Sequence, residues 1–69
     1  MNTNMTNKKL AKLYMSHGRV ITGLISEPIS YSYYEIQIVK IENPIPNDWE
    51  DNSVVKISKG LVEKFEFKS

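Results

Sequence analysis

The spacing of apolar positions changes along the chain, and the first segment has the spacing of a helix. Leu10, Leu13 and Tyr14 repeat at i, i+3 and i+4, and the neighbouring lysines fall on the other side. This predicts a short helix over residues 7–15 that packs its apolar stripe on a sheet. The same segment leaves one alternative open, in which Leu13–Ser16 is a short strand that leads into a hairpin turn.

The segment His17–Ser26 is the centre of the predicted fold, because it has the pattern of a strand with both faces covered. Ile21 and Ile25 point to one face with Gly23 between them, and the residues that alternate with them are also largely apolar. Glycine has no side chain, so the strand can bend at Gly23 or let another backbone approach closely. Gly18 is expected to form the turn that precedes this strand. We therefore expect the first long strand of a small, strongly bent sheet.

Three later segments alternate with period two and predict strands. Residues 34–41 form one of them, with a bulge at Ile38 and Val39, where the apolar phase slips by one residue. Residues 54–57 form a short strand, and residues 61–67 form the last one. Between the first two of these segments, residues 43–53 hold two prolines and three acids and are expected to be a long loop. Three apolar side chains of the last strand are predicted to face the core: Leu61, Phe65 and Phe67.

These elements predict a mainly β protein with a short N-terminal helix and a small, strongly bent antiparallel five-stranded sheet or barrel. A parallel sheet would need helical crossovers, and the sequence offers none between the strands. Residues 1–5 are expected to be a disordered tail, and residues 6–69 a single small β-barrel domain.

Length and composition limit what such a domain can be. The chain has 69 residues and no cysteine, so it cannot strengthen a small core with disulfides or thiolate metal sites. Association into a homo-oligomer is therefore expected, through strands near residues 34–41 and 61–67. No apolar run is long enough to span a membrane, and the polar N-terminus lacks the features of a signal peptide. We expect a soluble, cytoplasmic protein without a membrane partner.

Charge is unevenly distributed although the net charge is only +1. Residues 1–25 carry four basic side chains and no acid, whereas residues 26–54 carry one lysine and six acids. Residues 55–69 are basic again, with four lysines and two acids. A net charge this small does not by itself indicate a nucleic-acid binder.

Two segments carry a resemblance to a known family. Residues 13–25, LYMSHGRVITGLI, look like the first motif of the Sm-like, Hfq-like small β-barrels, with Gly18 and Gly23 at its glycine positions. Residues 54–65, VVKISKGLVEKF, are similar to the second motif, where Lys59 and the next glycine match. The chain departs from the family at His17, where an acid or asparagine is usual, and in the loop after the second strand. The glycine spacing is shared with SH3-like barrels, the wider class.

The resemblance implies an RNA-binding or single-stranded nucleic-acid-binding site. In that interpretation Tyr31 or Tyr33 would stack on a base and Lys59 would contact a phosphate or base. The remaining basic residues of this interpretation are Lys8, Lys12 and Arg19. The alternative is that Tyr34 belongs to the core and the other two tyrosines cover its edge.

The tryptophan of the long acidic loop indicates a different partner. An aromatic residue surrounded by acids is typical of a contact for a basic protein. The candidate partner-binding residues are Trp49, Asp48, Glu50, Asp51, Tyr31 and Tyr33. The alternative is that Trp49 folds back and caps an open end of the barrel.

Catalysis is not predicted, because the sequence has no catalytic triad order, phosphate-binding loop or metal-ligand spacing. His17 beside a turn glycine is interpreted as a surface residue, and we expect neither a cofactor nor a metal. The leading prediction is a non-enzymatic protein-interaction adaptor or inhibitor that acts as an oligomer, possibly of phage or mobile-element origin. The alternative is an Sm-like RNA-binding or single-stranded nucleic-acid-binding protein. Charge favours the first and the resemblance favours the second.

Overall fold

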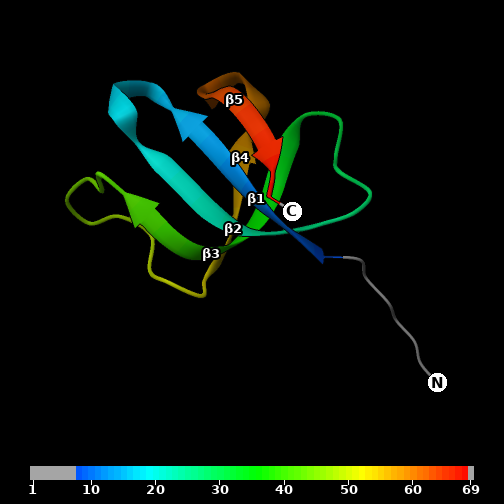
Figure 1. Cartoon of the computed structure of the whole chain (residues 1–69), viewed down its shortest axis with the longest axis horizontal. Coiled ribbons are helices and arrows are strands. Elements are labelled where there is room, and N and C mark those ends of the chain that lie inside the picture. Colours follow the sequence, from blue (N-terminus) through cyan, green and yellow to red (C-terminus); the bar gives the residue numbers. More distant parts are fainter. Residues whose placement is uncertain (1–7, 69) are drawn as a thin grey trace.

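The computed structural model describes residues 8–68, which form one five-stranded antiparallel sheet (Figure 1). The spatial order of the strands is β4-β3-β2-β1-β5. The first four strands are therefore neighbours in chain order, and the last one returns to the free side of β1. The strands are β1 (Lys8–Met15), β2 (Val20–Ser26), β3 (Tyr33–Glu42), β4 (Val54–Ser58) and β5 (Val62–Phe67). Two single-turn 3-10 segments connect strands: η1 (Ser16–Gly18) and η2 (Lys59–Leu61).

The predicted N-terminal helix is wrong, because its segment forms β1. The strand pairs with β2 on one side and with β5 on the other, and this pairing overrides the helical spacing. Ala11 and Leu13 are completely buried, whereas Leu10 lies on the other face and is partly exposed. The alternative of a strand followed by a turn is confirmed, although the strand already begins at Lys8. The predicted tail over residues 1–5 lies outside the described residues.

The predicted bend at Gly23 is confirmed by the register of β2 against β3. Thr22 pairs with Lys40 and Gly23 pairs with Ile38, so Val39 is the extra residue of a bulge, as the phase slip predicted. A Cβ atom at Gly23 would fall on the carbonyl oxygen of Gln37 and lie 2.6 Å from a side-chain carbon of Ile36. Gly23 therefore lets the backbone of β3 approach more closely than a side chain at this position would allow.

The core fills the concave face of this sheet. Seven side chains are buried there, and every strand except β5 contributes at least one: Ala11, Leu13, Ile21, Ile25, Ile36, Ile38 and Ile57. Phe65 of β5 packs against them, but Phe67 is 42% exposed. Leu61 lies in η2 and is exposed, so its predicted core position is wrong. The turn at η2 ends β4 before the alternation of β5 begins.

The edges of the sheet are β4 and β5. Residues 61–67, one of the two segments expected to lie at an edge, do include the edge strand β5. The other segment, residues 34–41, belongs to β3, which lies between β2 and β4, so that prediction is wrong. Within residues 8–68, no helix is long and apolar enough to cross a bilayer.

Candidate functional site

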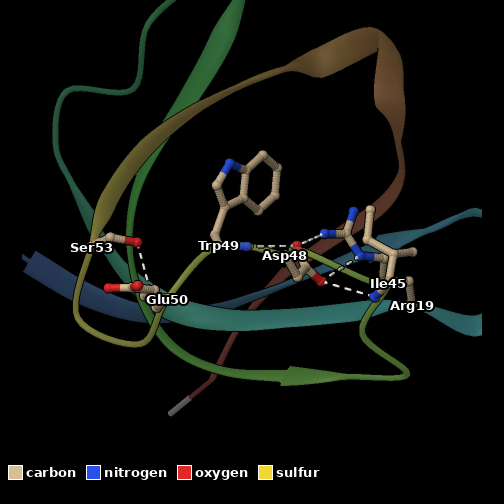
Figure 2. Close-up of polar contacts among 6 residues, drawn as sticks. All are labelled: Arg19, Ile45, Asp48, Trp49, Glu50 and Ser53. Carbon is tan, nitrogen blue, oxygen red and sulfur yellow. Dashed lines mark hydrogen bonds and ion pairs between the residues drawn. The ribbon is translucent and has the colours of Figure 1, made fainter.

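The most highly organised surface feature is the connection between β3 and β4, residues 43–53, which we call the Trp49 loop. Its centre is the carboxylate of Asp48 (Figure 2). Arg19, the residue before β2, donates to both carboxylate oxygens: its Nη2 forms a close ion pair with Oδ1, and its Nε lies 3.3 Å from Oδ2. Two backbone amides also donate to this carboxylate, from Ile45 at 3.2 Å and from Trp49 at 2.8 Å. One side chain therefore fixes the loop to the body of the sheet.

Burial makes this ion pair more than a surface contact. The side chains of Arg19 and Asp48 are only 13% and 9% exposed. Burial of the carboxyl group raises the pKa of Asp48, but hydrogen bonds from the Trp49 amide, Arg19 and the Ile45 amide outweigh that effect. The pKa of Asp48 therefore lies below its ordinary value of 3.8, and the charged form is the one that holds the loop.

Arg19 also positions the indole ring. Its guanidinium carbon lies 5.0 Å from the centre of the Trp49 ring, within the range of a cation–π interaction. The guanidinium group thus contacts the carboxylate of Asp48 and the indole of Trp49 at the same time. Trp49 keeps 37% of its surface exposed, so most of the residue is covered and the alternative that it caps an end of the barrel stays a prediction.

Further hydrogen bonds hold the ends of the Trp49 loop. The side-chain amide of Asn43 donates to the carbonyl of Gly18 at 2.8 Å, which ties the start of the loop to the β1–β2 turn. At the other end, the amide of Asn52 donates to the carbonyl of Ile38 at 2.6 Å. Asn43, Asn47 and Asn52 all have positive φ, a conformation that asparagine accepts better than most residues. The asparagines of the sequence therefore favour the observed path of the loop.

The outer surface of the Trp49 loop is apolar and acidic. Ile45 and Trp49 are both exposed, and their amides are fixed by the same carboxylate. Glu50 and Asp51 are exposed as well, and neither forms an ion pair within residues 8–68. The loop therefore exposes two apolar side chains and two negative charges.

The predicted partner-binding residues do not form a single site. Trp49, Glu50 and Asp51 share the surface of the loop, but the carboxylate of Asp48 faces Arg19 and holds the loop in place. Tyr31 belongs to the connection between β2 and β3, residues 27–32, which we call the Tyr31 loop. The two loops leave opposite ends of β3 (Figure 1).

The tyrosines near the Tyr31 loop have different environments. Tyr31 is 98% exposed, so it does not cover the edge of Tyr34 as the core alternative required. The ring of Tyr33 lies 5.2 Å from the ammonium group of Lys56. Tyr34 packs against the core and stacks on Phe65 with ring centres 4.8 Å apart. Tyr34 is only partly buried, so the part of the alternative that placed it in the core is confirmed only as far as packing against the core.

The predicted nucleic-acid-binding residues are also dispersed. Arg19 is held by Asp48 and Trp49 and is mostly buried. Lys8 and Lys12 lie on the face of β1 that points away from the core, because they alternate with the buried residues. Lys59 lies in η2, with its ammonium group 5.2 Å from the ring of Tyr34.

Sequence reasoning missed the pair of Arg19 and Asp48, which are separated by 29 residues. No local periodicity links two such positions, and the only signal in the sequence was that Arg19 lies in a basic segment and Asp48 in an acidic one. Residues 8–68 form no pocket and no cluster of three His, Asp or Glu side chains suited to a metal ion. No family model matches the chain, and no curated protein or solved structure shows significant similarity to it.

Proposed function

We propose that the protein is a non-enzymatic protein-interaction module and that the Trp49 loop is its contact surface. One observation carries this proposal: the largely buried pair of Arg19 and Asp48 contacts both the backbone amide and the ring of a partly exposed tryptophan. Binding usually costs entropy, because exposed side chains and loops become ordered in the complex. An aromatic side chain that is already oriented avoids part of this cost and is a typical hot-spot residue.

The charge of the surface indicates the chemistry of the partner. Glu50 and Asp51 follow Trp49 directly in the chain, are exposed, and form no ion pair within the described residues. A partner with an apolar side chain between basic residues would match both features. We therefore expect a basic protein segment as the partner.

Two further proposals concern family and assembly. The strand order and the bend at Gly23 support the Sm-like assignment within the small β-barrels, whereas the strand at Lys8–Met15, in place of a helix, counts against it. Association into a homo-oligomer is supported by the two sheet edges, β4 and β5, which present unpaired backbone groups. Sedimentation at high micromolar protein concentration tests this point, and a monomer would contradict it.

A peptide selection tests the proposed function. A random peptide library displayed on phage is selected on the immobilised protein, and the enriched peptides are synthesised and titrated. We expect basic peptides with one large apolar residue, and we expect Trp49→Ala to weaken their binding by about 30-fold, the effect of a typical hot spot. A Tyr31→Ala variant is the matched control, because it removes an exposed tyrosine at the other end of β3. Peptides that bind Trp49→Ala as tightly as the parent would contradict the proposal.

A further inference from the structure

A second surface lies where side chains of β5 contact those at the start of β3. The Trp49 loop does not contribute to it. Three aromatic side chains form a continuous row there, which we call the aromatic row: Tyr34, Phe65 and Phe67. The rings of Tyr34 and Phe65 are parallel, with centres 4.8 Å apart and planes inclined by 1°. Phe67 meets Phe65 edge-on at 4.9 Å. Phe67 is 42% exposed, so this end of the row is open to solvent.

A lysine lies over each end of the aromatic row. The ammonium group of Lys9 is 5.3 Å from the centre of the Phe67 ring, and that of Lys59 is 5.2 Å from the centre of the Tyr34 ring. The first lysine comes from β1 and the second from η2, so the fold brings them to one row from opposite ends of the sequence. A positive charge thus flanks the aromatic row at each end.

We propose that the aromatic row and its two lysines bind single-stranded nucleic acid. Bases stack on aromatic side chains without regard to sequence, and lysines beside the rings pair with phosphates. When a base stacks on Phe67, Lys9 moves from the ring to the adjacent phosphate. Base–aromatic stacking is generally stronger than a cation–π contact at an exposed site, so this exchange favours binding.

The lysines favour a nucleic acid over an apolar protein partner at this surface. A protein that covered the aromatic row with apolar side chains would also remove the ammonium groups of Lys9 and Lys59 from water without pairing them, which is costly. A polyanion pairs both groups. One acid opposes this: Glu27 lies 3.8 Å from the ammonium group of Lys9. We therefore expect that removing the charge of Glu27 strengthens nucleic-acid binding.

The test is fluorescence anisotropy with labelled oligonucleotides of about 12 nucleotides, a length within the usual range for one small binding domain. Oligo-uridylate and oligo-deoxythymidylate are titrated separately, because the row has no feature that selects the sugar. A duplex of the same length is the control, since its bases are not free to stack. We expect both single strands to bind and the duplex to bind more weakly.

Substitutions in the aromatic row and at its lysines test whether the oligonucleotide binds there. Phe67→Leu keeps an apolar side chain but removes the ring, and we expect about tenfold weaker binding. The double variant Lys9→Gln/Lys59→Gln should reduce the slope of log affinity against log salt by about 1.4, because two phosphates are then left without a cation. Glu27→Gln should bind more tightly than the parent.

Matched controls separate this site from general charge and from the Trp49 loop. Lys8→Gln/Lys12→Gln removes the same charge from the outer face of β1, and Trp49→Ala removes the other aromatic contact; both should bind nearly as the parent does. Thermal unfolding of Phe67→Leu shows whether it is folded, and the lysine variants test the proposal even if it is not. The proposal is overturned by an absence of binding at low salt. Equal losses for the two lysine pairs would also overturn it.

Discussion

The Trp49 loop and the Tyr31 loop lie at opposite ends of β3 and expose their aromatic residues in different ways. Tyr31 is 98% exposed, whereas Trp49 is 37% exposed. In the Tyr31 loop, hydrogen bonds form at Ser32, whose carbonyl accepts from the Lys59 amide at 3.0 Å and whose amide donates to a serine hydroxyl at 3.4 Å. In the Trp49 loop, a largely buried ion pair fixes the residue next to the aromatic one.

This difference shows that exposure alone does not make a contact residue effective. A fully exposed side chain loses rotational freedom when a partner binds it, and this loss opposes binding. Trp49 presents less surface, but Arg19 and Asp48 already hold it in place. We therefore assign the stronger anchor to the less exposed of the two aromatic residues.

The largest loss of stability is expected from a substitution at Gly23, because the bent sheet that it permits supports both loops. Gly23→Val places side-chain atoms on the carbonyl of Gln37 and on Ile36, and a carbonyl within a paired strand cannot move aside as the end of a flexible side chain could. We expect a loss of about 3 kcal/mol of unfolding free energy, measured by urea denaturation. Gly60→Ala is the matched control, because its Cβ would only come within 3.7 Å of a serine hydroxyl, and it should be nearly neutral. A Gly23→Val variant as stable as the parent would contradict the close packing of β2 and β3.

The next largest loss of stability is expected from breaking the ion pair that ties the Trp49 loop to the sheet. Arg19→Gln leaves the carboxylate of Asp48 buried without its cation, and we expect a loss of about 2 kcal/mol of unfolding free energy. The emission of Trp49 should shift to longer wavelength as the loop loosens. Lys9→Gln is the control: it removes an exposed pair with Glu27, and its effect should be below about 0.5 kcal/mol. Equal stability of the two variants would show that the buried pair does not hold the loop.

A smaller loss of stability is expected when the pH is lowered, because Asp48 becomes protonated. The pKa of Asp48 in the folded protein lies below its ordinary value of 3.8, so its contribution to stability is complete above that pH and is lost as the pH falls through the lower, folded value. Hydrogen bonding with Tyr14 also lowers the pKa of Glu66, which adds a pH dependence of the same sign. The comparison with Asp48→Asn therefore isolates the loop: the stability difference between parent and variant should shrink in acid. A difference independent of pH would contradict the role of the charged carboxylate.

Local pattern predicted those parts of the fold that local chemistry controls. The bend at Gly23 and the bulge at Val39 follow from a missing side chain and from a phase slip, and the structure confirms both. The helix at the start of the chain was wrong because Leu10 and Leu13 also fit a strand, and pairing with β2 and β5 decides between the two.

The site was less predictable, because it depends on contacts between distant segments. The sequence placed Glu50 and Asp51 on the loop surface, where they are exposed, but it left open whether Trp49 is exposed or caps the barrel. It did not reveal that Asp48 is turned toward Arg19, because sequence spacing carries no information on which acid and base meet across a folded sheet. It also missed that Tyr34 and Phe65 stack, since one belongs to β3 and the other to β5.

Trp49, and not Tyr31, is the proposed anchor for a protein partner. The most direct measurement is calorimetric titration of a basic peptide, selected on the parent protein, against the Trp49→Ala and Tyr31→Ala variants. We predict that Trp49→Ala costs about 2 kcal/mol of binding free energy and that Tyr31→Ala costs less than about 0.5 kcal/mol. A larger loss for Tyr31→Ala than for Trp49→Ala would contradict the claim.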